Sequence, residues 1–265
     1  MSQQERWQLG GNAPEVYERY LVPAIFRPWA PILIAQAMLQ AGERVLDVAC
    51  GTGVVARLAA QHVGASGHVT GLDISDAMLA LGQRRCVDLS GAGRASFIKA
   101  DATALPFADS AFDVAVSIQV YEYVADLPTA LVELHRVLRP GGRVLILDTD
   151  WDSIVWHATD TEQMGRLLAA WIERFADPYL PRTLARRLRD AGFQVDRRDV
   201  LVLLNPEYDP DTYSVANGEL MADFAVTQGR LTRHEVDAWT QDLHRLGEEG
   251  RYFFSLNRYL FLANR

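Results

Sequence analysis

The sequence lacks any long uninterrupted run of apolar residues. No stretch approaches the roughly 20 apolar residues that a bilayer-spanning helix needs, and no basic-then-apolar signal segment opens the chain. These absences predict a protein without a membrane span. Repeats and low-complexity segments are absent as well. With 265 residues and 49% hydrophobic content, the chain is long enough to bury a full core as one domain.

Cysteine and positive charge are also scarce. The two cysteines, Cys50 and Cys86, suggest no disulfide framework, which predicts a cytoplasmic location. Two thiols are too few to hold a metalloid such as arsenite, and we expect no metal site. The formal net charge of −8 disfavours nucleic acid as a partner, because phosphate binding needs a basic face. The arginines between residues 182 and 198 are interpreted as a solvated face balanced by acids.

The sequence does contain a strand, a glycine turn and a helix in direct succession. The segment Arg44 to Val48 is rich in aliphatic residues and is typical of a strand covered on both faces. Gly51 and Gly53 permit backbone angles closed to other residues and let a ligand approach the main chain. Helical periodicity begins at Val54. Such units bind the nucleotide part of a cofactor at the carboxyl edge of a parallel sheet.

Two cofactor classes fit this turn. Gly51-x-Gly53-x-x-Ala56 matches the dinucleotide fingerprint, and Asp73 follows about 20 residues later, where a ribose-binding acid belongs. Asp47, at the end of the strand, distinguishes the two classes. Its carboxylate would repel a pyrophosphate, whereas it suits the sulfonium and ammonium groups of a cofactor with an amino-acid tail. The residues therefore favour a sulfonium cofactor over a nicotinamide.

Further motifs follow in order along the chain. They are Asp47-Val-Ala-Cys-Gly51-Thr-Gly53, Gly71-Leu-Asp73-Ile74-Ser75 with Met78, Ala100-Asp101-Ala102, Ser110-Ala-Phe112-Asp113 and Leu138-Arg-Pro140-Gly141-Gly142. In this series the chain resembles the class I S-adenosylmethionine-dependent methyltransferases, and within them the menaquinone/ubiquinone C-methyltransferase-like (type 11) group. Ala49 stands where the family motif has its first glycine.

The resemblance implies a fold and a set of cofactor contacts. The implied fold is α/β, a doubly wound Rossmann-like seven-stranded sheet with an antiparallel last strand. Asp73 is expected to bind both ribose hydroxyls, and Asp101 the adenine amino group. Tyr17 and Tyr20 are expected in a lid over the cofactor. The full implied set for S-adenosylmethionine is Tyr17, Tyr20, Asp47, Ala49, Gly51, Gly53, Asp73, Ile74, Met78, Asp101, Ala102 and Gln119.

The resemblance and the hydrophobic pattern together predict how the chain is organised. Residues 1–40 are expected to form a helical lid, residues 41–150 the cofactor-binding core, and residues 151–265 the rest of the sheet. Strands are predicted at 44–48, 68–73, 95–99, 112–117, 143–148, 195–204 and 252–263. Residues 205–228 look irregular and are interpreted as an inserted cap or a subunit contact. Thr232 and Glu235 form a capping box that opens a helix.

Methyl transfer needs alignment of donor and acceptor, and a base only if the acceptor must lose a proton. Candidates lie after the fourth and fifth strands. His157 suits a general base, or else packs within an aromatic loop. Tyr121 is a wall candidate, and Glu122 faces either the cofactor tail or solvent. Asp150 either orients the acceptor or caps a helix.

The acceptor is expected to be a small, flat, apolar or aromatic metabolite, because aromatic residues surround the predicted mouth of the site. A methyltransferase acting on such a molecule is the favoured function. An NAD(P)-dependent oxidoreductase and a non-catalytic cofactor-binding subunit remain alternatives. The chain is also expected to form a homodimer or to act alone, and the sequence does not distinguish these states.

Overall fold

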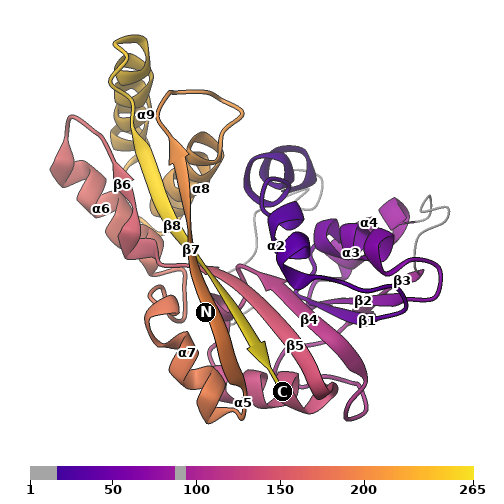
Figure 1. Ribbon diagram of the computed structural model, residues 1–265. Helices are drawn as coiled ribbons and strands as arrows, with labels where there is room; N and C mark the ends of the chain where they lie inside the picture. The colour runs from indigo at the N-terminus through magenta and orange to yellow at the C-terminus, as the bar shows by residue number, and fades with distance from the viewer. Residues whose placement is uncertain (1–16, 87–93) are drawn as a thin grey trace.

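A mixed β-sheet with helices on both faces forms the centre of the molecule (Figure 1). The computed structural model describes residues 17–86 and 94–265. The strands are β1 (Arg44–Val48), β2 (His68–Asp73), β3 (Arg94–Lys99), β4 (Phe112–Ile118), β5 (Leu138–Thr149), β6 (Val155–Trp156), β7 (Gln194–Asn205) and β8 (Phe254–Asn264). Their order is β3-β2-β1-β4-β5-β8, and both β7 and β6 pair with β8.

The strand directions confirm the predicted Rossmann-like arrangement. β1 to β5 pair in parallel, whereas β8 runs antiparallel to both β5 and β7. The last strand is therefore antiparallel, as expected. The prediction of seven strands is short by one within the described residues, because the two-residue strand β6 pairs with the start of β8. A strand of two residues is too short to show an alternating pattern in the sequence.

Burial of the sheet on both faces explains its continuous apolar strands. In β1, Val45 packs on one side with α2 (Ala30–Ala37) and α3 (Val54–Val63). The next residue, Leu46, packs on the other side with α5 (Leu127–Val137) and α7 (Pro181–Asp190). Helix α4 (Asp76–Cys86) packs against β2 and β3. Because side chains alternate between faces, strands of this kind need apolar residues at nearly every position.

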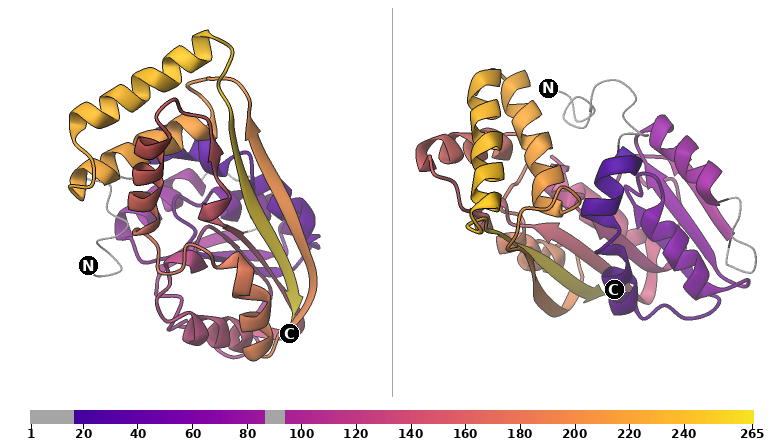
Figure 2. Two further views of the ribbon diagram at one scale, coloured as in Figure 1. Left: turned by 90° about the vertical axis from the view of Figure 1, so that its left-hand side faces the viewer. Right: turned by 90° about the horizontal axis from the view of Figure 1, so that it is seen from above.

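The strands β7 and β8 continue beyond the carboxyl edge of β5. The last β5 pair joins Thr149 to Arg258, whereas β7 and β8 stay paired as far as Asn205 and Phe254. Three helices pack together at this extended end, namely α6 (Thr161–Ile172), α8 (Tyr213–Thr227) and α9 (Arg233–Glu248). Figure 2 shows α8 and α9 side by side above the end of the sheet. Helix α8 also packs against the helical segment η1 (Tyr17–Phe26).

The region 205–228 was expected to be irregular, and this prediction is wrong, because α8 occupies most of it. The residues of α8 itself are apolar or small on most sides of the helix, so the sequence shows no single apolar stripe. Gly218 lies where a Cβ would come within 2.8 Å of Trp156 and 3.0 Å of Trp239. The glycine weakens the helical signal in the sequence but lets two tryptophans pack closely on the helix.

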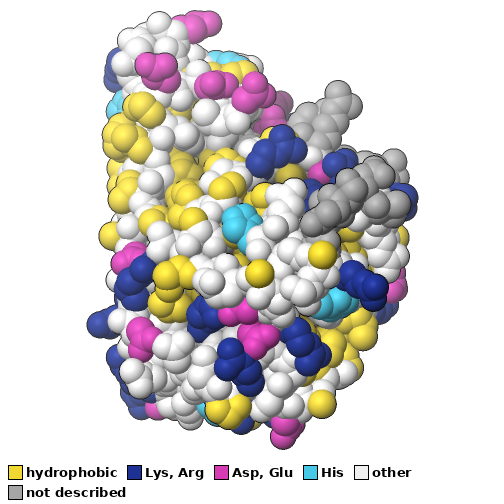
Figure 3. All heavy atoms as spheres, turned by 45° about the vertical axis from the view of Figure 1, so that its right-hand side comes forward, with side chains coloured by type: hydrophobic (Ala, Val, Ile, Leu, Met, Phe, Trp, Pro, Cys, Tyr) yellow, Lys and Arg dark blue, Asp and Glu magenta, His cyan; other side chains and the backbone are white. Residues whose placement is uncertain are grey.

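The arginine-rich segment forms ion pairs with neighbouring acids, as expected for a solvated face. Arg182 pairs with Asp150, and Arg187 with Asp177 at 2.8 Å. On the face drawn in Figure 3, basic and acidic side chains are interspersed over the lower half, and apolar side chains gather above them. The predicted capping box at Thr232 and Glu235 is confirmed. Among the described helices, none is both long and apolar enough to cross a bilayer.

Candidate active site

The glycine turn after β1 has the backbone shape that a bound nucleotide needs. Ala49, Gly51 and Gly53 all have positive φ angles, of 52°, 53° and 75°. A Cβ on Gly53 would lie 2.8 Å from the ring of Phe97, so a side chain there would be both strained and crowded. The turn thus keeps its main chain free of side chains at the carboxyl edge of the sheet.

Asp73 ties this turn to the end of β2. Its Oδ2 accepts a hydrogen bond from the Gly51 amide at 2.9 Å, and its Oδ1 accepts one from the Ser75 amide at 2.9 Å. Burial raises the pKa of Asp73, and these amides oppose the shift. Each carboxylate oxygen can accept a further hydrogen bond, so the acid is still able to receive the hydroxyls of a ribose.

Asp47 is a buried carboxylate without a cationic partner among the described residues. Its Oδ2 makes no hydrogen bond within the described part of the chain. Burial raises its pKa to about 8, helped by the nearby charge of Asp73 and opposed by the backbone amide of Ala56. An orphaned acid of this kind fits a positively charged group that arrives with a ligand.

The remaining cofactor candidates lie at the ends of the neighbouring strands. Asp101 follows β3, and its Oδ1 accepts hydrogen bonds from the amide and hydroxyl of Thr103 at 2.8 and 2.7 Å. Ala102, Ile74 and Met78 are half-buried after β3 and β2. Gln119 follows β4 with a φ of 55° and is buried. All of them therefore lie beyond the carboxyl ends of parallel strands, where such folds bind ligands.

The segment η1 lies directly against the glycine turn. Tyr17 is buried, and a Cβ on Gly51 would come within 3.2 Å of its hydroxyl. The next residue, Glu18, is also buried; it accepts a hydrogen bond from the Thr52 hydroxyl and pairs with Arg85 at 2.9 Å. Glu18 thus joins η1 to the turn through a carboxylate that the sequence analysis missed. The side chain of Tyr20 lies outside the described residues.

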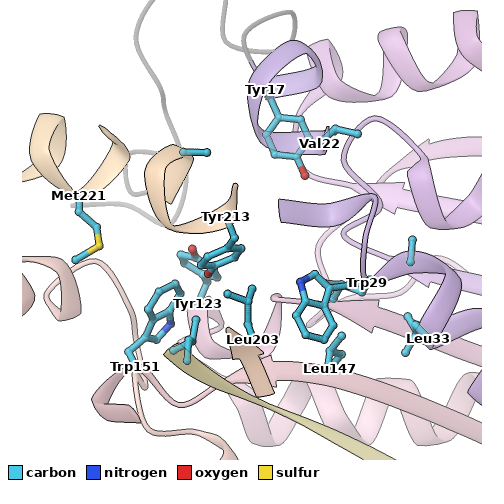
Figure 4. Packing of buried hydrophobic residues seen from close by; sticks show 14 of the residues in the cluster. Tyr17, Val22, Trp29, Leu33, Tyr123, Leu147, Trp151, Leu203, Tyr213 and Met221 are labelled. Carbon is cyan, nitrogen blue, oxygen red and sulfur yellow. The ribbon is translucent and has the colours of Figure 1, made fainter. Parts of the chain in front are cut away.

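An aromatic cluster lies beside η1 at the ends of β4 and β5. Figure 4 shows Tyr123 and Tyr213 together, with Trp151 next to them and Trp29 on the opposite side, below Tyr17. Tyr123 packs on Phe175, with ring centres 4.9 Å apart, and Phe175 stacks on Trp151 at 4.7 Å. These rings come from η1 and the turn after it, from α8, from the loop after α6, and from the segments after β4 and β5.

Three ionisable side chains are fully buried at the ends of β4 and β5 and in β8: Glu122, Asp148 and Arg258. Burial raises the pKa of Glu122 well above its usual range, and the charge of Asp148 adds to the shift. Burial also raises the pKa of Asp148 to about 6, although its Oδ1 accepts the Val120 amide at 2.9 Å. The Arg258 guanidinium lies over the ring of Trp29, 4.9 Å from its centre.

Comparison with known proteins agrees with this geometry. The family model described as "Methyltransferase domain" matches residues 45–142. The ubiquinone/menaquinone biosynthesis C-methyltransferase UbiE of Xylella fastidiosa (strain M12) is 37% identical over 132 residues, or 50% of this chain and 52% of that protein. The chain thus spans about half the length of this curated relative. The demethylmenaquinone methyltransferase of Geobacillus kaustophilus is 32% identical over 203 residues, covering 71% of this chain and 82% of the relative.

The chain belongs to the class I S-adenosylmethionine-dependent methyltransferases, in the UbiE-like group. Its fold agrees: the structure of a putative methyltransferase from Bacillus halodurans superimposes with a TM-score of 0.63 at 19% identity, covering 89% of this chain and 97% of that one. The cofactor of this family is S-adenosylmethionine, and the nicotinamide alternative is not favoured.

Three of the predicted catalytic residues lie apart from the aromatic rings or are paired with other side chains. His157 is exposed, and its amide pairs with Phe253 at the outer end of the sheet. Asp150 is held by two hydrogen bonds from Arg182, at 2.7 and 2.9 Å. Tyr121 is buried in the cluster on the α5 and α7 face, opposite Tyr123. Tyr121 thus lies on the opposite face from Tyr123, His157 is exposed, and Asp150 is paired with Arg182.

Glu122 is the one predicted catalytic residue that lies with the aromatic cluster. Its Oε2 accepts the Thr149 amide at 3.3 Å, and its backbone carbonyl accepts the amides of Ala176 and Asp177. Burial disfavours the charged form of Glu122, because it raises the pKa of this acid well above its usual range. Its hydrogen bonds to Thr149, Ala176 and Asp177 hold the loops around the site together.

Proposed function

We propose that this chain transfers the methyl group of S-adenosylmethionine to a ring carbon of a small planar acceptor of the quinol type. The observation that carries the proposal is the aromatic cluster next to the cofactor turn, in a chain whose core is similar to C-methyltransferases. Flat rings stack well on tyrosine and tryptophan side chains. The named activity of two relatives, methylation of quinone precursors, supports this acceptor class.

The acids of the turn would hold the cofactor. Asp47 would pair with the ammonium of its amino-acid tail, because it lies at the glycine turn and its buried Oδ2 makes no hydrogen bond within the described residues. Asp73 would receive the ribose hydroxyls, and Asp101 the adenine amino group. When bound, S-adenosylmethionine supplies a methyl group already activated by a sulfonium. The chain then has to align the acceptor and keep water away.

The aromatic cluster would provide that alignment. Trp29 and Tyr17 lie on the η1 side, and Tyr213 comes from α8. Since α8 packs against η1, a ring bound between them would be enclosed by both segments. We propose that residues 1–40 act as a lid over the core at 41–150, and that residues 205–228 act as a substrate cap within 151–265. Residues 1–16 lie outside the described part of the chain.

We propose that the protein is cytoplasmic. Cys50 and Cys86 are both free thiols, which is compatible with the expected cytoplasmic location. A homodimer stays a prediction, which light scattering of the purified protein would test.

A transfer assay tests the proposed function. The purified chain is incubated with methyl-labelled S-adenosylmethionine and a reduced demethylmenaquinone carrying a short side chain. We expect a product heavier by one methylene whose new methyl group is on the ring, as shown by mass spectrometry and NMR. The variant Asp47→Asn should lose most of this activity. Tight cofactor binding without transfer to any quinol or phenol would instead indicate the non-catalytic subunit.

A further inference from the structure

A fully buried arginine lies at the end of the sheet next to the aromatic cluster. Arg258 belongs to β8, in the alternating series Leu256, Arg258 and Leu260 that faces the core. Its register partner is Thr149, the last residue of β5. A charged side chain in a buried series of leucines is costly unless something compensates it.

The guanidinium of Arg258 has no hydrogen-bond partner within the described part of the chain. Its Nε, Nη1 and Nη2 atoms are all buried and unpaired. Oγ1 of Thr149, the register partner of Arg258, is unpaired as well. Buried donors are nearly always satisfied in native proteins, so these four unpaired atoms fit a polar ligand.

Most of the ionisable groups around Arg258 are ones whose charged form is disfavoured by burial. Burial lowers the pKa of Arg258, while Tyr213, Glu122, Asp148 and Tyr123 oppose the shift. Of these, burial disfavours the charged form of Glu122 and of both tyrosines, because it raises their pKa values. Asp148 can be charged, but its carboxylate also accepts backbone amides on the β4 side.

Arg258 is also close to the cofactor side of the site. Its guanidinium rests on the Trp29 ring, and Trp29 follows η1. In η1, Tyr17 is close to Gly51 of the cofactor turn. The raised pKa of Tyr17 reflects burial first and then the charge of Asp73, with a smaller contribution from Tyr123. Tyr17 is therefore near the glycine turn and within electrostatic reach of Asp73 and Tyr123.

We propose that Arg258 binds an anionic oxygen of the methyl acceptor, so that the acceptor is a planar ring with an acidic hydroxyl group, bound as its phenolate. This inference rests on the proposed function and narrows its acceptor class. A guanidinium presents several N–H donors to one oxygen, and such charge-assisted bonds are strong when they are buried. The aromatic cluster would stack on the ring while Arg258 holds its oxygen.

An ionised oxygen also activates the ring for methylation at carbon. The carbon ortho to the phenolate supplies the electron pair of the new carbon–carbon bond. The bond between the methyl carbon and sulfur breaks, and its electron pair returns to sulfur. The ring carbon then loses its proton to water, which restores the aromatic phenolate. Arg258 acts by holding the charged oxygen throughout and takes up no proton itself.

Calorimetry on the complex with S-adenosylhomocysteine tests the inference without turnover. The probes are 1-naphthol, the more acidic 2,4-dichloro-1-naphthol, and 1-methoxynaphthalene, which has no ionisable hydroxyl. We expect the dichloronaphthol to bind best, 1-naphthol to bind more tightly as the pH rises, and the methoxy compound to bind at least tenfold more weakly than the dichloronaphthol. In Arg258→Met the preference for the dichloronaphthol over the methoxy compound should fall at least tenfold. The affinity for S-adenosylhomocysteine should stay unchanged.

Arg143→Met is the matched control, because Arg143 is a half-buried arginine that pairs with Glu43 at the opposite edge of the sheet. Arg258→Lys keeps the charge and tests the site if Arg258→Met does not fold; it should retain the acidity preference at reduced affinity. The inference is overturned if the methoxy compound binds the wild type as tightly as the naphthols do, or if none of the naphthols binds. It is also overturned if Arg258→Met weakens the binding of S-adenosylhomocysteine as much as the binding of the dichloronaphthol. Loss of S-adenosylhomocysteine binding by the wild type would instead contradict the proposed function.

Discussion

At the scale of single residues, the turn after β1 contains an alanine in a glycine conformation. Ala49 has a φ of 52°, and a left-handed residue with a Cβ costs about 1–2 kcal/mol. Part of that cost is offset because glycine has more freedom in the unfolded chain, by roughly 0.4–1 kcal/mol. Ala49→Gly should therefore raise the free energy of unfolding by about 0.5–1 kcal/mol. Urea denaturation measures it.

Gly53→Ala provides the opposite case. It adds a Cβ at a φ of 75° and places it 2.8 Å from Phe97, so it should destabilise the protein by more than 1 kcal/mol. If the two substitutions changed the free energy of unfolding equally, backbone conformation would not determine the stability of this turn.

Asp47 illustrates a conflict between stability and cofactor binding. In the folded protein its pKa is raised to about 8, well above the ordinary value of 3.8. The free protein therefore loses stability as the pH rises from 4 to 8, because the buried acid must then be charged. Asp47→Asn removes this loss, and its melting temperature should exceed that of the wild type increasingly over this range. A gain of about 1 kcal/mol corresponds to roughly 2–4 °C.

The same variant should bind S-adenosylmethionine about 10–100 times more weakly, since a charge-assisted hydrogen bond contributes about 1.5–3 kcal/mol. Calorimetry at pH 8 measures the affinity. Asp113→Asn is a control, because Asp113 is a partly exposed acid that pairs with Arg139 away from the glycine turn. An Asp47→Asn protein that is less stable yet binds normally would contradict both roles.

At the scale of helices and strands, the sequence predicted an element correctly where residues close together in the chain determine its structure. β1 and β2 have the predicted bounds, because each is an apolar run ended by turn residues. Helix α8 was missed because it is buried on most sides and contains Gly218. The strand that contains Arg258 was predicted, but Arg258 itself was missed. Its alternation with Leu256 and Leu260 was the signal that could have placed it on the buried face.

Attachment of η1 to the cofactor turn gives a prediction at this scale. Glu18 accepts a hydrogen bond from Thr52 and pairs with Arg85, so it fixes η1 and thereby Tyr17 over Gly51. Glu18→Gln keeps the size but weakens both contacts. Hydrogen exchange at residues 17–26 should become faster, and the affinity for S-adenosylmethionine should fall about 3–30-fold.

Glu133→Gln, which alters a contact with Arg136 in α5, should leave both quantities unchanged. Faster exchange in η1 with unaltered affinity would show that the segment is not part of the cofactor site.

At the scale of the whole molecule, the two halves of the site differ in how the chain builds them. The proposed cofactor half uses residues at the ends of β1, β2 and β3, each marked by a short motif, so the sequence alone was enough to propose Asp47, Asp73 and Asp101. The proposed acceptor half brings together η1, α8 and β8, which are far apart in the chain. No local pattern links Trp29 to Arg258, so only the folded structure shows that they meet.

Because these distant segments meet around one ligand site, ligand binding should stabilise the whole fold. A ligand at 100 times its dissociation constant adds about 2.7 kcal/mol to the free energy of unfolding. S-adenosylhomocysteine at that excess should raise the melting temperature by roughly 5–11 °C. The rise should be larger at pH 8 than at pH 6, since Asp47, with a pKa of about 8 in the free protein, must be charged to pair with an ammonium. Differential scanning fluorimetry measures both shifts. NADH serves as the comparison ligand: a shift with NADH and none with S-adenosylhomocysteine would contradict the assignment of the site, because the acids at this turn repel a pyrophosphate.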